Sequence, residues 1–76
     1  MQIHEFPAEY FLELTGNEFL LGRLSINKMG RGFWVEVDIV AKESKKIYRH
    51  VGDLHNVEDL DEAITRSVQM LSEYLK

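Results

Sequence analysis

Hydrophobic and polar side chains alternate along most of the first two thirds of the chain. The alternating runs cover residues 9–15, 19–28, 33–41 and 47–51. Because successive side chains of a β-strand point to opposite faces, a period of two predicts a strand in each run. Segments around Gly16 and Gly30 separate the first three runs and are typical of tight turns. The pattern predicts an antiparallel β-meander of three to four strands within residues 8–51.

The apolar spacing changes toward the C-terminus from two residues to three and four. The residues that repeat in this way are Leu60, Ala63, Ile64, Val68, Leu71 and Leu75. This spacing places one apolar stripe along a helix, which we expect over residues 56–75. Asn56 is expected to cap its first turn, with Asp59 three residues later in a capping box. The element order is then ββββα, a single α+β domain with one helix packed on one sheet face.

Two stretches near the N-terminus leave alternatives open. Residues 1–7, which end at Pro7, are expected to form an arm or a short edge strand. Residues 7–15 also fit a short helix, because proline in a first helical turn and glycine just beyond a helix end are both favoured. We favour the strand, since its alternation continues the period of the meander.

One helix cannot cover both faces of this sheet. A helix is about 10 Å wide and neighbouring strands lie about 4.8 Å apart, so it shields roughly two strands on one face. The face predicted to lie beneath the helix carries Tyr10, Leu12, Leu14, Leu20, Leu24, Ile26, Phe33, Val35, Val37 and Ile39. The opposite face is predicted to bind a partner through Phe11, Phe19, Leu21, Arg23, Trp34 and Val40, and it also carries Glu36 and Asp38. Large exposed apolar patches usually mark such contact surfaces.

The alternative is that the N-terminal arm folds back and covers this second face with Ile3 and Phe6. Otherwise the face meets a second copy of the chain or another protein. A homodimer is the simplest arrangement, because a self-complementary patch needs no second gene product. Small chains without disulfides also often gain stability by associating.

Composition narrows the class of protein. The 76 residues include no cysteine, so neither a disulfide nor a thiolate metal cage can stabilise them. The first residues lack the basic-then-apolar pattern of a secretory signal, and no apolar run approaches the ~18 residues of a membrane span. We therefore expect a cytoplasmic location and no membrane partner.

The net charge of −4 is unevenly distributed. Residues 23–49 hold seven basic and three acidic residues, a net +4, while the rest of the chain holds two basic and ten acidic, a net −8. An alternative function, nucleic-acid binding, would use Arg23, Lys28, Arg31, Lys45, Lys46 and Arg49 with the sheet aromatics. We place it second to protein binding, because a sequence pI near 5.2 is far below that expected of a nucleic-acid-binding domain.

Two motifs suggest a catalytic or a nucleotide-binding site, but each lacks a feature that such a site requires. Glu36 and Asp38 point to one face about 6.6 Å apart along a strand, a separation near that of a glycosidase pair. No loop in the predicted meander is long enough to build a cleft around them, so we interpret them as solvated strand charges. The segment Gly30-Arg31-Gly32 lacks the third glycine of a dinucleotide fingerprint and precedes a strand instead of a helix.

A third motif, His50, Asp53 and His55, consists of legitimate zinc ligands, with His4 as a possible fourth. Its spacing matches no dedicated zinc motif, and Gly52 predicts a turn, so we interpret these as polar residues leading into the helix. We expect no catalytic residue, no metal ligand and no cofactor. The sequence thus predicts a small non-catalytic protein-interaction or regulatory module, homodimeric, with its contact surface around Trp34.

Overall fold

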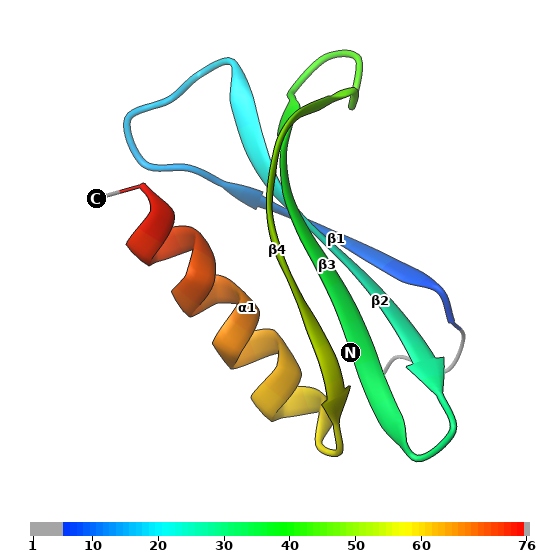
Figure 1. Ribbon diagram of the computed structural model, residues 1–76. Coiled ribbons are helices and arrows are strands. Elements are labelled where there is room, and N and C mark those ends of the chain that lie inside the picture. Colours follow the sequence, from blue (N-terminus) through cyan, green and yellow to red (C-terminus); the bar gives the residue numbers. More distant parts are fainter. Residues whose placement is uncertain (1–5, 76) are drawn as a thin grey trace.

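The computed structural model describes residues 6–75, which form one open antiparallel sheet and one helix (Figure 1). The strands follow one another in space in their order along the chain, β1-β2-β3-β4, and α1 comes last. Their bounds are Ala8–Glu13 for β1, Leu20–Met29 for β2, Gly32–Ala41 for β3, Ile47–Val57 for β4 and Leu60–Tyr74 for α1. The predicted ββββα order is confirmed.

The strand interpretation of the N-terminal segment is confirmed over its helical alternative. All six residues of β1 pair with β2, from Ala8 opposite Ile26 to Glu13 opposite Leu21. The turn that follows depends on Gly16, whose φ of 80° suits glycine. The Asn17 side chain then accepts hydrogen bonds from two successive backbone N–H groups at the start of β2.

The core lies between the sheet and α1, on the face that the alternation predicted. All ten residues predicted beneath the helix belong to it: six are buried, and Tyr10, Leu12, Leu20 and Phe33 are half-buried. Burying one such side chain fully stabilises the fold by about 1.5–3 kcal/mol. The sequence pattern was therefore sufficient to place this face.

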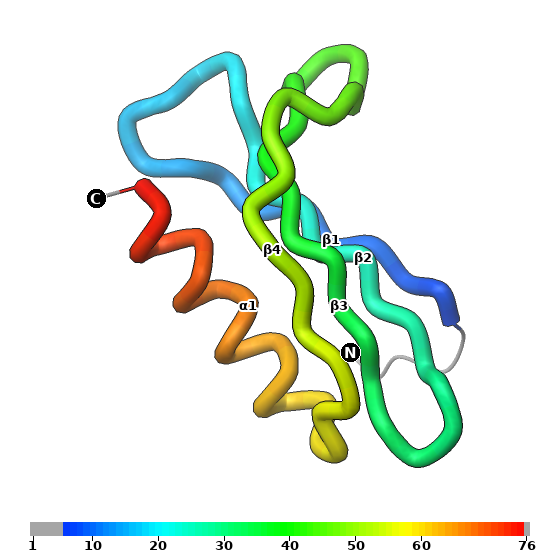
Figure 2. Tube along the Cα trace, viewed as in Figure 1, coloured from blue at the N-terminus to red at the C-terminus, as the bar shows by residue number. Residues whose placement is uncertain are grey.

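The helix lies close against β3 and β4, with fewer contacts to β2 (Figure 2). Two strand glycines permit this approach. A Cβ on Gly22 would lie 2.7 Å from a methyl group of Leu71, and one on Gly52 would lie 2.5 Å from the terminal methyl of Met70. The buried Ser67 donates its hydroxyl to the Ala63 carbonyl at 2.7 Å, so this small polar residue is satisfied within the helix. Gly22 therefore leaves room for Leu71 of the helix. The strand pairing is regular on both sides of Gly22, so it does not mark a bulge.

The junction between β4 and α1 differs from the prediction. β4 continues to Val57, six residues beyond its expected end, and Asn56 belongs to it with a positive φ of 55°. Asp59 is the N-cap in place of Asn56, and its carboxylate accepts a hydrogen bond from the Glu62 N–H at 3.1 Å. The expected boundaries at residues 51 and 56 were wrong because the bulges of β4 interrupt its alternation.

The apolar stripe of α1 is also rotated from its predicted position. Leu60, Ala63, Ile64 and Leu71 face the sheet as expected, but Val68 and Leu75 remain exposed. Their places against the sheet are taken by Ser67 and Met70. In the described part of the chain, no helix has both the length and the apolar character needed to cross a membrane.

Phe6 answers part of the question about the N-terminal arm. Its ring lies 5.5 Å from that of Phe33, centroid to centroid, and it packs against the core on the helix side. The alternative prediction required Phe6 to cover the opposite face, and Phe6 does not do so. Ile3, the other residue of that prediction, lies outside the described residues.

Candidate functional site

The face of the sheet opposite α1, called the open face below, carries a row of charged residues across its middle strands. The strand register places Arg23 on β2 opposite Asp38 on β3, and Asp38 opposite His50 on β4. Phe11 on β1 pairs with Arg23 and completes the row. Each strand therefore contributes one residue.

The pairing of β3 with β4 has three irregularities, and one of them builds the site. Asp38 pairs with His50 but Val37 pairs with Gly52, so Val51 is an extra residue in β4. Residues three apart in a regular strand point to opposite faces. The bulge reverses this alternation and brings His50 and Asp53 to the same face. The prediction of a turn at Gly52 was wrong for this reason.

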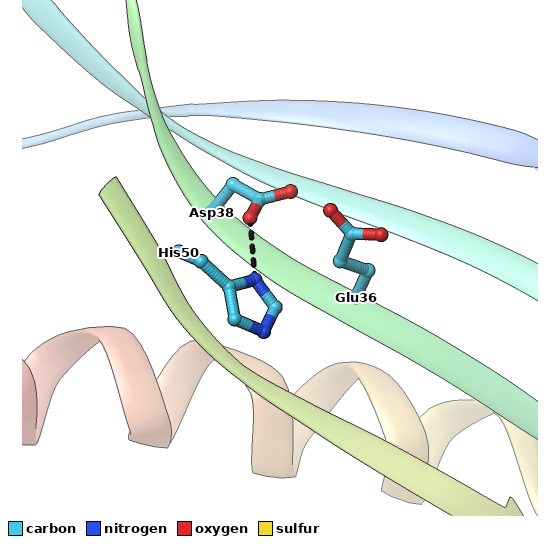
Figure 3. A group of neighbouring side chains, drawn as sticks. All are labelled: Glu36, Asp38 and His50. Atoms are coloured by element: carbon cyan, nitrogen blue, oxygen red, sulfur yellow. Dashed lines mark hydrogen bonds and ion pairs between the residues drawn. The ribbon is translucent and has the colours of Figure 1, made fainter. Parts of the chain in front are cut away.

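Asp38 is the centre of the row and is fully buried (Figure 3). One of its oxygens, Oδ2, accepts a hydrogen bond from Nη2 of Arg23 at 2.8 Å. The other, Oδ1, lies 2.7 Å from Nδ1 of His50. The Nε2 of the same imidazole lies 3.0 Å from Oδ2 of Asp53. The buried carboxylate is thus held from both sides by cationic or protonatable groups, as burial of a charge requires.

Longer contacts extend the row at its edges. The guanidinium of Arg23 also lies 3.7 Å from a carboxylate oxygen of Glu9 and 3.7 Å from one of Glu36. The cluster therefore contains four carboxylates against one guanidinium and one imidazole. It carries a net negative charge whether or not the imidazole is protonated.

The hydrogen bonds of the cluster shift three pKa values. Burial alone would raise the pKa of Asp38, but hydrogen bonds with Glu36, His50 and Arg23 outweigh it and hold that pKa below its ordinary value. Hydrogen bonds to Asp38 and Asp53 raise the pKa of His50. A hydrogen bond to Asp38, together with partial burial, raises the pKa of Glu36. The protonated imidazole is favoured because both ring nitrogens then donate.

Glu36, Asp38 and His50 also form a possible metal-ligand group, since each offers an atom within 4.8 Å of the others. A cation in their midst would compete with contacts that are already made. It would have to displace Nη2 of Arg23 from Asp38 or break the bond between Asp38 and His50. The three residues therefore fit an internal ion-pair cluster better than a metal centre. His55, a candidate zinc ligand from the sequence, lies apart from this group and against Trp34 instead.

The pair of Asp38 and His50 has the geometry of the orienting half of a catalytic triad. In a triad, however, the second imidazole nitrogen faces a nucleophile. In this fold it faces the Asp53 carboxylate. Among the described residues, the second nitrogen of His50 is therefore engaged by a carboxylate and not by a hydroxyl or thiol.

Beyond the charged row, near the end of β4, the open face carries an aromatic pair. The rings of Trp34 and His55 lie 4.4 Å apart, centroid to centroid, and Trp34 stays 39% exposed. A hollow of about 440 Å³ lies beside them, called the Trp34 hollow below. Its lining includes Ser25, Asn27, Trp34, Glu36, Asp53 and His55. Indole and carboxylates thus line one depression.

At the other end of the open face, two predicted contact residues are inaccessible. Leu21 and Val40 are paired on neighbouring strands, but their exposed fractions are only 8% and 0%. The ammonium of Lys45, in the turn after β3, lies 5.5 Å from the ring centre of Phe11 on β1. The side chain of Lys45 therefore reaches back toward β1 at this end of the sheet, where both residues are buried. Exposure of both residues was predicted wrongly, because the sequence does not show where the turn folds.

The other predicted contact residues lie in different places. Phe11 and Trp34 are exposed on the open face, Phe11 at the β1 end of the charged row and Trp34 four residues before Asp38 along β3. Phe19, the most exposed of them, precedes β2 in the loop after β1. Arg23 is on the predicted face, yet its side chain is only 16% exposed and is engaged by carboxylates. Phe11 and Trp34 therefore remain the accessible members on the strands of the open face, while Phe19 is accessible in the loop before β2.

The basic residues of the nucleic-acid alternative do not form one surface. Lys28 and Arg31 lie at the turn between β2 and β3, and Lys45 and Lys46 at the turn between β3 and β4, at opposite ends of the sheet (Figure 1). The carboxylates of the charged row lie between them, and Arg23 is one of its members. Arg49 pairs with Ile39 of the helix face, so it is also separate from the open face.

A second depression lies between α1 and the edge strand β1. This groove, of about 500 Å³, is called the α1–β1 groove below. Its lining includes Leu12, Leu14, Thr15, Val68, Leu71 and Leu75. The groove explains why Val68 and Leu75 are exposed: α1 lies over β3 and β4, and the sheet beneath this side of the helix ends at β1.

Comparison with known proteins found no match: no family model, no curated protein and no solved structure is similar to this chain. The functional interpretation therefore depends on the geometry of the two depressions and the charged row.

The sequence contained a signal for half of the row. A two-residue turn at Gly30 and Arg31 fixes the hairpin register, and that register places Arg23 opposite Asp38. The role of His50 had no comparable signal, because it depends on a bulge.

Proposed function

We propose that this chain is a non-catalytic protein-interaction module that binds its partner on the open face. The observation that supports it is that one face carries two exposed aromatic residues, Phe11 and Trp34, together with a row of charged side chains that hydrogen-bond to one another. Aromatic anchors around a pre-organised polar centre are typical of protein contact surfaces. Because the charged side chains of this chain are already fixed, they lose less conformational entropy when a partner binds them.

The charge of the open face favours a basic partner. Glu9, Glu36 and Asp53 are each about half exposed and lie around the row. Two copies meeting face to face would bring these carboxylates together, and like charges across an interface oppose association. A basic segment of another protein would be attracted to the same carboxylates.

We propose that self-association, expected from the sequence, uses the α1–β1 groove instead. Two observations support this location. β1 is an edge strand with an unbroken register, whereas the other edge strand, β4, is interrupted by bulges that discourage pairing. Val68 and Leu75 expose apolar surface beside β1. A second copy can extend the sheet along β1 and bury both residues.

The test of partner binding compares matched variants of the whole chain. Trp34→Glu should abolish binding of a partner isolated with the wild-type chain, while Tyr74→Glu, which adds the same charge at an exposed aromatic of α1, should retain it. Binding is then measured with purified components, and amide shifts in the labelled chain locate the contact. A partner that binds both variants equally, or shifts only residues of α1, would contradict use of the open face.

A further inference from the structure

The Trp34 hollow combines an aromatic surface with acidic groups that retain free acceptors. Trp34 contributes the aromatic surface and is partly accessible, with His55 on one side of it. Glu36 and Asp53 line the same hollow, and their side chains are 46% and 45% exposed. A ligand entering the hollow therefore meets an indole and two carboxylates at once.

Among the described residues, these carboxylates keep acceptor capacity beyond the contacts of Glu36 with Asp38 and of Asp53 with His50. The closest approach of Arg23 to Glu36 is 3.7 Å, too long for a hydrogen bond. Asp53 contacts His50 through Oδ2 only, which leaves Oδ1 as an acceptor. No lysine or arginine lines the hollow among the described residues. The described lining of the hollow thus supplies two carboxylates and no cation of its own, and the nearest cationic groups are Arg23, 3.7 Å from Glu36, and His50, 3.0 Å from Asp53.

We propose that the Trp34 hollow binds the guanidinium of an arginine side chain from a basic segment of the partner, stacked on Trp34 and paired with Glu36 and Asp53. This rests on the proposed function and names the chemistry that the open face recognises. A guanidinium fits better than an ammonium, because its planar form stacks on an indole and still donates to carboxylates in its own plane. Arg23 shows on the neighbouring strand that this face already holds one guanidinium between carboxylates.

The test uses the isotope-labelled full chain and three capped tripeptides with glycine on each side of the central residue. The central residue is arginine, lysine or citrulline, the last being a neutral isostere of arginine. The arginine peptide should produce saturable shifts at the Trp34 indole N–H and at the backbone amides of Glu36 and Asp53. We expect weak binding, with a Kd on the order of 10 mM. The lysine peptide should bind at least about threefold more weakly, and the citrulline peptide should give no saturable shift.

Variants connect the response to the hollow. Trp34→Ala and the double variant Glu36→Gln with Asp53→Asn should each remove saturable binding of the arginine peptide, while Tyr48→Ala should retain it. The amide spectrum of each variant shows whether its fold is intact. Trp34→Phe keeps an aromatic ring and should therefore retain part of the binding of the arginine peptide.

Three results would overturn the assignment: equal shifts with the citrulline peptide, equal binding of the lysine peptide, or shifts that leave Trp34 unaffected. Failure of this inference is distinct from failure of the proposed function. If Trp34→Glu abolishes binding of a protein partner while the arginine peptide does not bind, the open face is a contact surface but the hollow holds no guanidinium. If the peptide binds and no partner depends on Trp34, the hollow holds a guanidinium but the open face is not the contact surface.

Discussion

Nδ1 of the half-exposed His50 lies 2.7 Å from Oδ1 of the fully buried Asp38. This contact joins an edge strand to a charge at the centre of the sheet. The imidazole covers one side of the carboxylate while Arg23 covers the other. In the part of the chain that the structure describes, the open face therefore keeps a buried charge between neighbouring side chains of the sheet itself.

The first prediction concerns the energetic role of Asp38. Asp38→Asn should lower the free energy of unfolding by about 2–4 kcal/mol, because the mostly buried Arg23 loses its closest counter-charge. Chemical denaturation at neutral pH measures the change. Glu13→Gln, at an exposed carboxylate on β1, should change stability by less than about 0.5 kcal/mol.

A double-mutant cycle separates the pair from its surroundings. Asp38→Leu and Arg23→Met should each be strongly destabilising, since each leaves a charge with fewer partners. Combined, they should cost less than the sum of the two single changes, because an apolar pair leaves neither charge unpaired. Strict additivity would mean that the contact between Asp38 and Arg23 contributes nothing to stability.

The second prediction concerns the pH dependence of stability. The folded state raises the pKa of His50 above that of the unfolded chain, about 6.5. Its contribution is therefore complete below pH about 6.5 and is lost as the pH rises through the folded-state pKa. The raised pKa of Glu36 acts in the same direction at lower pH. The lowered pKa of Asp38 acts in the opposite direction, and its contribution to stability is lost only as the pH falls below its ordinary value of 3.8. The free energy of unfolding should therefore fall as the pH rises above about 6.5 and level off beyond the folded-state pKa of His50.

His50→Gln should flatten this dependence, because glutamine hydrogen-bonds but does not titrate. Denaturation at a series of pH values measures it, and the histidine proton resonances report the pKa directly. An unchanged slope in the variant, or a His50 pKa below its ordinary value, would contradict the geometry of the row.

Much of this fold could be predicted because its strands and hairpin register follow local rules. Alternation placed residues such as Val35 and Val37 beneath the helix, and the two-residue turn at Gly30 sets Arg23 opposite Asp38. The end of β4 could not be predicted in this way. Its bulges change which face a side chain occupies, so His50 and Asp53 appear from spacing alone to point apart.

The site was harder to predict than the fold for a second reason. Whether a residue on a known face is accessible depends on what lies over it. Leu21 and Val40 were placed on the correct face, but both are buried at the end of the sheet where the side chain of Lys45 reaches back to Phe11. Phe6 similarly packs beside Phe33 and not on the open face. These are long-range contacts, and single-chain periodicity contains no information about them.

The third prediction ranks three strand glycines by what a methyl group would meet. Gly32→Ala should be the most costly, because its Cβ would lie 2.9 Å from the backbone of Asn56, which cannot rotate away. Gly22→Ala should cost about 1–3 kcal/mol, since Leu71 is buried but its side chain can shift. Gly52→Ala should cost least, because the half-buried Met70 is flexible. Thermal melting of the three variants gives the order, and a Gly52→Ala variant less stable than Gly32→Ala would refute it.

The fourth prediction locates the contact between two copies of the chain. If the α1–β1 groove holds a second copy, Val68→Glu should convert a dimer to a monomer, because it places a charge in a surface that the dimer buries. Sedimentation equilibrium measures the mass. The fold should persist, since Val68 is already 42% exposed in the single chain.

Two controls make this result specific. Gln69→Glu adds the same charge to α1 on the side facing Leu54 and Arg66, away from the groove, and should leave the dimer intact. Trp34→Glu should also leave the mass unchanged, because the open face is assigned to a different partner. A wild-type chain that is monomeric at about 1 mM would remove the dimer altogether. If Trp34→Glu dissociates the dimer and Val68→Glu does not, the contact between the two copies lies on the open face instead. The carboxylates of Glu36 and Asp53 would then meet their own copies across the two-fold axis and would have to be neutralised there.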